Sequence, residues 1–199
     1  MDNKRLSALA LLIASIAGCG SSTSPPPPER PTASLSGVVF QGPIAGATVR
    51  AYGYTDGRRG TELGQALTDA SGRYTISGSI PAGVVLLEAN GGTYREEATG
   101  RDVTVGPSVP LRTLVRVTPG VDAGGAIGTY TTLAAGLAEY LAGRGRTIEA
   151  ATDEAYGTID NALGLDARAT LPLDITNVAN ATGAVTAAHE YGFFEAALS

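Results

Sequence analysis

Cys19 is the residue whose type and position most clearly suggest chemistry, because it is the only cysteine in the chain and it ends a targeting signal. Two basic residues precede the apolar run 6–16, and Ala17 and Gly18 stand directly before the cysteine. A charged start, a short apolar stretch and small residues before the cut are typical of a secretory signal. The sequence therefore predicts export, with cleavage between Gly18 and Cys19 and a thiol that can be acylated.

The stretch Ile16-Ala17-Gly18-Cys19 resembles the lipobox of bacterial lipoproteins. That resemblance implies that the thiol of Cys19 receives a diacylglycerol and that residues 1–18 are removed. Two or more acyl chains on one residue hold a protein stably at a bilayer surface. We therefore expect an exported protein of the cell envelope whose partner is membrane lipid, bound through acylated Cys19. In Gram-negative lipoproteins an aspartate directly after the lipidated cysteine resembles a signal for retention in the inner membrane. Residue 20 of this chain is glycine, so the outer membrane is favoured if the source is Gram-negative.

A membrane-spanning helix and an ordinary cleaved signal are the other interpretations of this segment. A transmembrane helix needs about 20 apolar residues, whereas this run is roughly half as long and stops at a Gly-Cys-Gly-Ser-Ser stretch. An ordinary signal peptide fits the charge and the length. It has no need, however, for a cysteine directly after the cut.

The mature chain lacks residue types that several classes of chemistry require. Past Lys4 there is no lysine, past Cys19 no cysteine, and His189 is the only histidine. These absences exclude a P-loop, a Schiff-base enzyme, a structural zinc site and an internal disulfide. Removing residues 1–18 takes away one acidic and two basic residues, which leaves 12 basic and 18 acidic side chains and a formal charge of −6. Nucleic acid is not an expected partner, because no basic stripe matches a phosphate backbone.

The remaining candidate residues have structural interpretations that we favour. His189 lies in Ala-Ala-His-Glu-Tyr, which is typical of one helical turn, and no G-x-S-x-G surrounds any serine. Asp56, Asp69 and Ser71 suggest a calcium loop, but the spacing of an EF-hand is missing, and Asp69 to Gly72 fits a type I turn. A glycosidase-type carboxylate pair stays formally open, although the chain has no Trp for a sugar platform. We expect no catalytic residue, no metal site and no cofactor.

Four tyrosines are open to two interpretations. Tyrosine contributes rigid amphipathic area at interfaces, so these rings could form a binding face, but packing in the core and at sheet edges is favoured for most of them. They are Tyr52, Tyr54, Tyr74 and Tyr94.

Composition divides the chain into five segments. The signal peptide, residues 1–18, is followed by a Pro/Ser-rich tether over 19–33, a β-rich segment over 34–118, a Gly-rich hinge over 119–128 and a helical segment over 129–199. An extended tether rising about 3.1 Å per residue would span roughly 35 Å. Short runs with alternating apolar residues, separated by Gly, Pro and Asp, indicate an antiparallel sandwich. The seven expected strands are 34–40, 46–54, 62–69, 73–80, 83–90, 92–99 and 103–117, the last broken near Pro107 or Pro110.

Val84 to Leu87 is apolar on both faces, which predicts a central strand covered on both sides.

Four motifs of the β-rich segment resemble the carboxypeptidase regulatory-like family. They are Ser36-Gly37-Val38-Val39, the stretch from Gly46 to Tyr52, the stretch from Thr68 to Ile76, and Ile80-Pro81-Ala82-Gly83. The resemblance implies a transthyretin-like, Ig-like β-sandwich used in exported proteins as a spacer, a binding module or an accessory to a larger domain. That family supplies no catalytic residues to carry over. The chain departs from the pattern after Gly83, where the expected aromatic residue is absent.

The last segment has helical periodicity. An apolar stripe at i, i+3, i+4, i+7, i+8 and i+11 runs through Tyr130, Leu133, Ala134, Leu137, Ala138 and Leu141. Thr147 is the expected cap of a second helix that ends at Gly164. A third helix is expected to begin near Asn177 and to reach Ser199 without a stop signal. Because it ends in exposed aromatics, we expect a helical partner chain or a continuation of the natural protein beyond Ser199.

The fold class predicted is therefore α+β, a seven-stranded sandwich followed by about three Ala-rich helices. The functional hypothesis is a non-enzymatic, membrane-anchored envelope lipoprotein whose sandwich binds protein or glycan or acts as a spacer. The alternative is the N-terminal accessory region of a larger exported hydrolase or transport-associated protein. Direct binding of a ligand would favour the first hypothesis, and co-purification with an enzyme the second.

Overall fold

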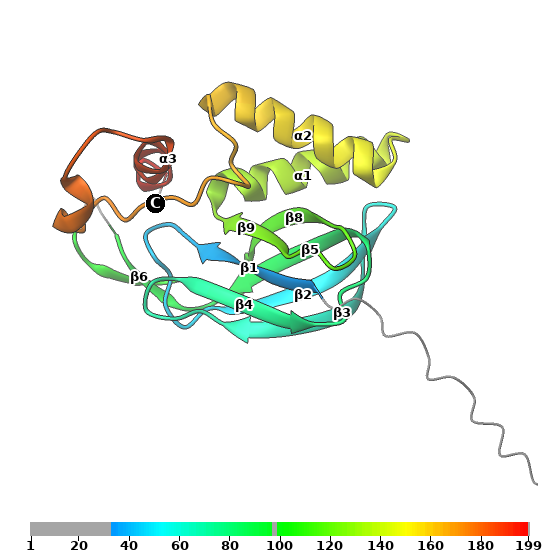
Figure 1. The fold of residues 1–199 in the computed structure, drawn as a ribbon, viewed down its shortest axis with the longest axis horizontal. Coiled ribbons are helices and arrows are strands. Elements are labelled where there is room, and N and C mark those ends of the chain that lie inside the picture. Colours follow the sequence, from blue (N-terminus) through cyan, green and yellow to red (C-terminus); the bar gives the residue numbers. More distant parts are fainter. Residues whose placement is uncertain (1–32, 97–98, 199) are drawn as a thin grey trace, which may run out of the picture.

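The computed structural model describes residues 33–96 and 99–198, and it places there a two-sheet sandwich with helices packed on one side (Figure 1). The predicted fold class, α+β with an N-terminal β-sandwich followed by helices, is confirmed. The described residues form nine strands rather than the seven expected, and the sandwich is not wholly antiparallel, because residues 123–127 of the expected hinge pair in parallel with the first strand. The strands are β1 (Ala33–Val39), β2 (Thr48–Thr55), β3 (Arg58–Leu67), β4 (Arg73–Gly78), β5 (Gly83–Asn90), β6 (Thr93–Arg95), β7 (Asp102–Thr104), β8 (Leu111–Val117) and β9 (Ala123–Ile127). The helices are α1 (Thr129–Gly143), α2 (Ile148–Leu163) and α3 (Ala187–Ala196), with the 3-10 turn η1 (Val178–Ala181) between α2 and α3.

The two sheets differ in their strand directions. In the three-stranded sheet, ordered β4-β1-β9, β1 pairs antiparallel with β4 and parallel with β9. The four-stranded sheet, ordered β3-β2-β5-β8, is antiparallel throughout. β6 and β7 form a separate hairpin. The predicted break in the last β run is confirmed, because Pro107 and Pro110 lie between β7 and β8.

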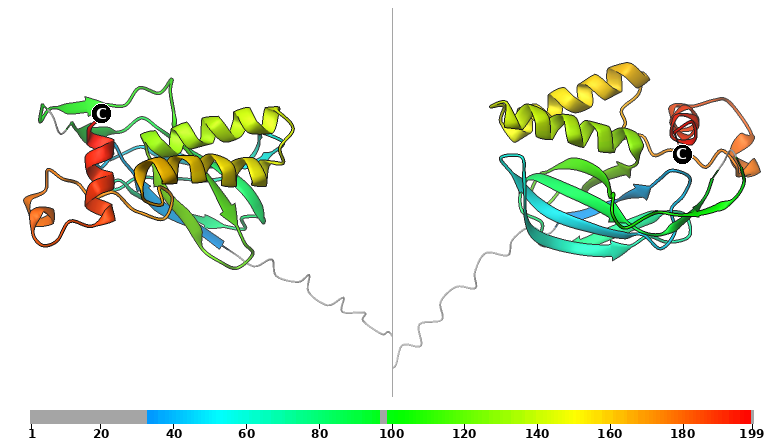
Figure 2. Two further views of the ribbon diagram at one scale, coloured as in Figure 1. Left: turned by 90° about the horizontal axis from the view of Figure 1, so that it is seen from above. Right: turned by 180° about the vertical axis from the view of Figure 1, so that it is seen from behind.

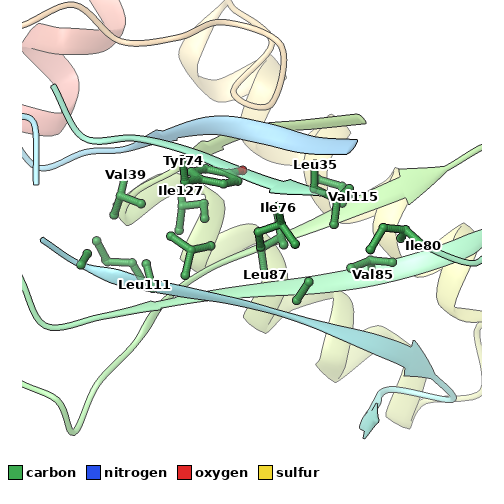
Figure 3. Close-up of a cluster of buried hydrophobic side chains, with 14 of the residues drawn as sticks. Leu35, Val39, Tyr74, Ile76, Ile80, Val85, Leu87, Leu111, Val115 and Ile127 are labelled. Atoms are coloured by element: carbon green, nitrogen blue, oxygen red, sulfur yellow. The ribbon is translucent and has the colours of Figure 1, made fainter. Parts of the chain in front are cut away.

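Alternate residues of β5 face opposite sides of its sheet, and both sides are covered. Val85 and Leu87 point into the core between the sheets (Figure 3). Val84 and Leu86 point the other way and pack against the residues of α1 and α2. This arrangement confirms the predicted central strand, and burial of these apolar side chains is the main contribution to stability.

α1 and α2 lie side by side on the outer face of the four-stranded sheet (Figures 1 and 2). The predicted ends of α2 are confirmed, because the side chain of Thr147 accepts a hydrogen bond from the N–H of Ala150 and Gly164 follows with a φ of 74°. The predicted stripe of α1 is partly wrong. Leu133 is 54% exposed, whereas the buried face consists of Thr131, Ala134, Ala135 and Ala138. Small side chains let α1 lie close to its neighbours, and the bulkier leucine is left outside.

The Gly-rich segment 119–128 is not a hinge over its whole length, because residues 123–127 form β9 and belong to the sandwich. Its glycines are required by close approach rather than by flexibility. Gly124 has a φ of 136°, and a Cβ there would lie 2.0 Å from the carbonyl oxygen of Ser36 on β1. Composition alone does not separate a glycine needed for a close approach from a glycine in a linker.

The third helix begins at Ala187, ten residues later than the predicted start near Asn177. Asn177 caps only the short turn η1, through a hydrogen bond from the N–H of Ala179 to its side chain. A stretch without helix follows, in which Gly183 has a φ of 101°. Tyr191 of α3 is fully buried against the sandwich, whereas Phe193 is 57% exposed.

β1 runs from one end of the sandwich to the other. We call the end where β1 begins proximal and the end where it finishes distal. At the proximal end the N–H of Ser34 donates a hydrogen bond to Asp122 at 2.8 Å, and at the distal end Val38 and Phe40 pack against Tyr191 of α3. Figure 1 shows α3 near the finish of β1 and away from its start. In the part of the chain that the structure describes, no helix is long and apolar enough to cross a membrane.

Candidate functional site

Gly18 and Cys19, the predicted cleavage and lipidation site, lie outside the described residues. Within 33–96 and 99–198, no three His, Cys, Asp or Glu side chains come together as a group that could hold a metal ion. The candidate functional surface must therefore be found among the other residues that the sequence singled out and the surfaces around them.

His189 serves as a structural residue at the start of α3. Its Nδ1 accepts a hydrogen bond from the N–H of Thr186 at 3.1 Å, so the ring proton is assigned to Nε2. Nε2 donates to the carbonyl of Asn180 at 2.7 Å. Because both ring nitrogens have protein partners, His189 fixes the loop before α3.

Asp69 is occupied by the turn between β3 and β4. Its Oδ1 accepts hydrogen bonds from the N–H groups of Ser71 at 2.8 Å and Arg73 at 2.9 Å. The N–H of Gly72 donates to the carbonyl of Asp69 at 3.0 Å, as in a closed β-turn. The favoured turn interpretation thus accounts for this carboxylate.

The four tyrosines do not form a common face. Tyr54, Tyr74 and Tyr94 are buried, which agrees with packing, and Tyr52 is half-buried under the guanidinium of Arg59 at 4.7 Å. The hydroxyl of Tyr74 donates to the carbonyl of Gly125 at 3.0 Å, and burial raises the pKa of this hydroxyl well above its usual range.

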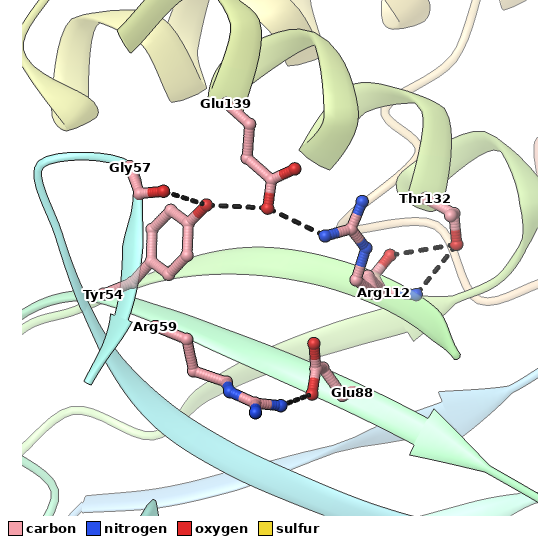
Figure 4. Close-up of polar contacts among 7 residues, drawn as sticks. All are labelled: Tyr54, Gly57, Arg59, Glu88, Arg112, Thr132 and Glu139. Atoms are coloured by element: carbon pink, nitrogen blue, oxygen red, sulfur yellow. Dashed lines mark hydrogen bonds and ion pairs between the residues drawn. The ribbon is translucent and has the colours of Figure 1, made fainter. Parts of the chain in front are cut away.

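A polar network joins the sheet to α1 (Figure 4). The hydroxyl of Tyr54 donates to Glu139 at 2.8 Å, and the same carboxylate oxygen accepts a hydrogen bond from Arg112 at 2.8 Å. Burial, together with the bond to Glu139, raises the pKa of the Tyr54 hydroxyl well above its usual range. A second ion pair, Arg59 with Glu88 at 2.8 Å, lies on the same face of the sheet. The bonds from Tyr54 and Arg112 to Glu139 hold α1 against the sheet, whereas the Arg59–Glu88 pair joins β3 to β5.

Hydroxyl groups of the two helices accept hydrogen bonds from backbone N–H groups on the outer edge of β8. The N–H of Arg112 donates to Thr132 of α1 at 2.8 Å, and the N–H of Leu114 donates to the hydroxyl of Tyr156 of α2 at 2.8 Å. Tyr156 also shares a 2.8 Å hydrogen bond with the hydroxyl of Thr113. Unpaired strand edges invite pairing with other chains, so the helices protect this edge and form one unit with the sandwich.

Glu195 attaches α3 to the start of α1. Its side chain is fully buried, and it accepts hydrogen bonds from the N–H groups of Thr129 at 2.9 Å and Tyr130 at 3.4 Å. A carboxylate at a helix N-terminus interacts favourably with the helix dipole. Burial nevertheless raises the pKa of Glu195, against the opposing effect of these hydrogen bonds.

An apolar candidate surface for binding lies at the distal end. Four exposed apolar residues on the C-terminal segment define it, and we call it the distal surface: Val178, Val185, Phe193 and Leu198, which are 82%, 69%, 57% and 50% exposed. Within it is a hollow of about 190 Å³ lined by Ile175, Asn180, Gly183, Val185, His189 and Phe193. Of the four residues, Val185 and Phe193 come together at this hollow. Exposed apolar side chains that gather in one place mark sites of interaction in proteins.

Comparison with solved structures finds a distant likeness. A DUF3823 family protein from Parabacteroides merdae ATCC 43184 is similar to this chain at 15% identity and a TM-score of 0.30. The match covers 51% of this chain and 48% of that one, so the chain spans about half the length of the protein it matches. No protein-family model matches the chain, and no curated protein matches it either.

Sequence reasoning missed the buried Glu195, the edge-capping Tyr156 and the distal hollow. Glu195 follows Phe193 and Phe194 directly, and a carboxylate within an apolar run is a signal for a buried, hydrogen-bonded charge. Tyr156 lies one helical turn after Thr152, which is also buried. The hollow depends on the non-helical stretch before α3, and no sequence pattern reveals that shape.

Proposed function

We propose that this protein is an exported, non-enzymatic envelope lipoprotein, anchored through acylated Cys19, whose folded domain binds a partner protein at its distal end. The support for anchoring is the charged, apolar and small-residue pattern that ends at Cys19. Gly20 supports placement in the outer membrane if the source is Gram-negative. The domain would act as a binding module held away from the lipid by the tether.

The observation that carries the binding proposal is the arrangement of the two ends. The chain enters the domain at Ala33, at the proximal end of β1, and the distal surface lies beyond the other end of that strand. A tether entering at one end leaves the opposite end accessible to a partner in the envelope.

The composition of the distal surface favours a protein partner over a glycan. Three of its four residues are aliphatic, and Phe193 is its only ring. Glycan sites need polar groups placed to hydrogen-bond hydroxyls, whereas the His189 nitrogens in the hollow are already bonded within the chain. Protein interfaces have an apolar centre of this kind.

We also propose that the sandwich is a module of the carboxypeptidase regulatory-like type. The four motifs that carry the resemblance coincide with structural features: β1, β2, the turn before β4 together with most of β4, and the segment that enters β5. A module of this type fits a binding or spacer role better than a catalytic one.

The test uses the full chain expressed in a bacterial envelope, with Cys19→Ser as the matched control. A photo-reactive amino acid replaces Phe193 at the distal end or Val121, which is 56% exposed, at the proximal end. We expect the anchored protein to stay with membranes after a high-salt wash, Cys19→Ser to be released, and a discrete protein adduct to form from position 193 alone. Release of the unaltered chain would refute anchoring, and equal adducts from both positions would refute distal binding.

A further inference from the structure

Glu195 is a buried acidic residue without a balancing cation. Among the described residues, the acidic side chains that are buried belong to Glu88 and Glu195. Glu88 forms an ion pair with Arg59 at 2.8 Å, whereas Glu195 forms none with any described residue. An ionised carboxylate taken out of water without a counter-charge is strongly disfavoured. Glu195 therefore lies where a neutral acid is tolerated better than a carboxylate.

The groups that surround Glu195 only partly compensate a negative charge. From α1 the N–H groups of Thr129 and Tyr130 donate to it, at 2.9 Å and 3.4 Å, and the helix dipole adds to their effect. The side chains of Tyr130 and Tyr191 interact with it but are neutral. The titratable or charged side chains beyond Tyr191 belong to α2 and the segment after it: Tyr156, Asp160 and Arg168. The guanidinium of that arginine lies over the ring of Tyr156 at 4.3 Å and is not within ion-pair distance of Glu195.

α3 is attached to the rest of the protein along one narrow face. Tyr191 and Phe194 pack against the end of β1 and its neighbours, and Glu195 binds the start of α1. A backbone bond from the N–H of Leu173 to the carbonyl of Ala188, at 3.0 Å, supports the start of the helix. The strands of both sheets pair without α3. Local opening of such an element leaves the core of a domain intact.

We propose that Glu195 is a latch whose protonation state controls the docking of α3. As a neutral acid it holds the helix at the start of α1, and as a carboxylate without a cation it releases the helix into water while the sandwich stays folded. Burial raises the pKa of Glu195, so release occurs as pH rises through the folded-state pKa. Release uncovers Val38 and Phe40, which pack against Tyr191, and moves Phe193 out of the distal surface. The latch works whether or not the distal surface binds a partner.

His189, at the start of α3, responds to pH in the opposite direction. Its Nδ1 accepts a hydrogen bond from the N–H of Thr186 at 3.1 Å, so protonation of this nitrogen removes the bond and loosens the helix on acidification. Glu190, on the same helix, is exposed, and water solvates its charge. Loss of docking as the pH is raised therefore identifies Glu195 and not His189.

The experiment is amide hydrogen exchange, measured by mass spectrometry on the detergent-extracted full mature chain from about pH 5 to about pH 8, where folded proteins are usually most stable. Glu195→Gln keeps the size of the side chain and an oxygen acceptor but carries no charge. Glu190→Gln removes an exposed charge from the same helix and is the matched control. Comparing the variants at the same pH cancels the effect of pH on exchange itself.

We expect residues 187–196 to exchange equally in the unaltered chain and in Glu195→Gln at the lowest pH. At the highest pH they should exchange at least about tenfold faster in the unaltered chain, since one unit of pKa corresponds to a tenfold change in an equilibrium. Glu190→Gln should match the unaltered chain, and β5 should exchange alike in all three. Equal exchange of α3 in the unaltered chain and Glu195→Gln at every pH overturns the inference. Opening on acidification alone, or faster exchange of β5 together with α3, overturns it as well.

Tryptophan fluorescence gives a second reading, because the chain has no Trp. Phe194→Trp places a reporter on the packed face of α3, and Phe193→Trp places one on the exposed face as its control. We expect the emission of the first variant to move to longer wavelength as pH rises and that of the second to stay constant. A shift that persists after Glu195→Gln is added contradicts the latch. Hydrogen exchange uses the native side chains of the packed face, so its result stands even where the larger ring prevents docking.

Discussion

Removing the hydroxyl of Tyr156 tests the claim that the helices satisfy the edge of β8. In Tyr156→Phe the ring stays, including its packing under Arg168 at 4.3 Å, while the acceptor for the N–H of Leu114 and the partner of Thr113 are lost. The three residues at this contact are fully buried: Tyr156, Thr113 and Leu114 are each 0% exposed. Water therefore cannot replace the lost bonds without local opening.

The expected cost follows from the two groups that lose their partner. A buried donor left unsatisfied costs about 1–3 kcal/mol, and a lost bond to a buried hydroxyl costs about 1 kcal/mol more. We expect Tyr156→Phe to lower the free energy of unfolding by about 2–4 kcal/mol, a large part of the roughly 5–15 kcal/mol typical of a domain.

The assay is urea unfolding of the full mature chain followed by circular dichroism. The midpoint should fall while the denaturant slope stays unchanged, because the surface exposed on unfolding is the same. Tyr140→Phe is the matched control, since Tyr140 is 59% exposed and its hydroxyl has no hydrogen bond with the described residues. That change should stay within about 0.5 kcal/mol. If both substitutions have the same small effect, the reasoning about the β8 edge is refuted.

Three further predictions follow from single side chains. Burial raises the pKa of Glu195 in the folded state, so its contribution to stability is complete below the unfolded pKa and declines as pH rises through the folded pKa. Urea unfolding across a pH series should therefore show wild type losing stability relative to Glu195→Gln as pH rises, and an advantage that grows with pH would contradict this. Gly124→Ala should lower the unfolding free energy by at least about 2 kcal/mol, because its Cβ would meet a backbone oxygen; an unchanged urea midpoint would show that β9 does not approach β1 closely. Gly136→Ala, in the middle of α1 with no atom within 4 Å of the added Cβ, should raise thermal stability by about 0.5–1 kcal/mol, and a loss of stability would mean that α1 packs more tightly on that side.

The sequence predicted correctly the ends of helices that depend on one capping residue. Thr147 and Gly164 mark the ends of α2 because a hydroxyl cap and a left-handed glycine act within one turn. β5 could be predicted in the same way, because a strand buried on both faces has a continuous run of apolar residues.

Features that depend on tertiary contact could not be predicted in the same way. β9 consists largely of glycine and alanine, and only its pairing with β1 makes it a strand. The start of α3 was misplaced because Asn177 is a good cap for any turn. The position of α3 depends on tertiary contacts, since Tyr191 packs on the sandwich and Glu195 binds the start of α1. The distal hollow, as a shape formed by several segments, has no signature in the sequence, whereas the predicted lipidation at Cys19 rests on the sequence alone.

The most direct test of the account is the intact mass of the protein extracted from its native membrane. The account predicts a chain that begins at Cys19 and carries the additional mass of a thioether-linked diacylglyceryl group, with or without a further acyl group, and fragmentation should place that mass on the first residue. A chain that retains residues 1–18, or one that begins elsewhere and carries no lipid, would contradict the proposal that this domain is held at a membrane by its only cysteine.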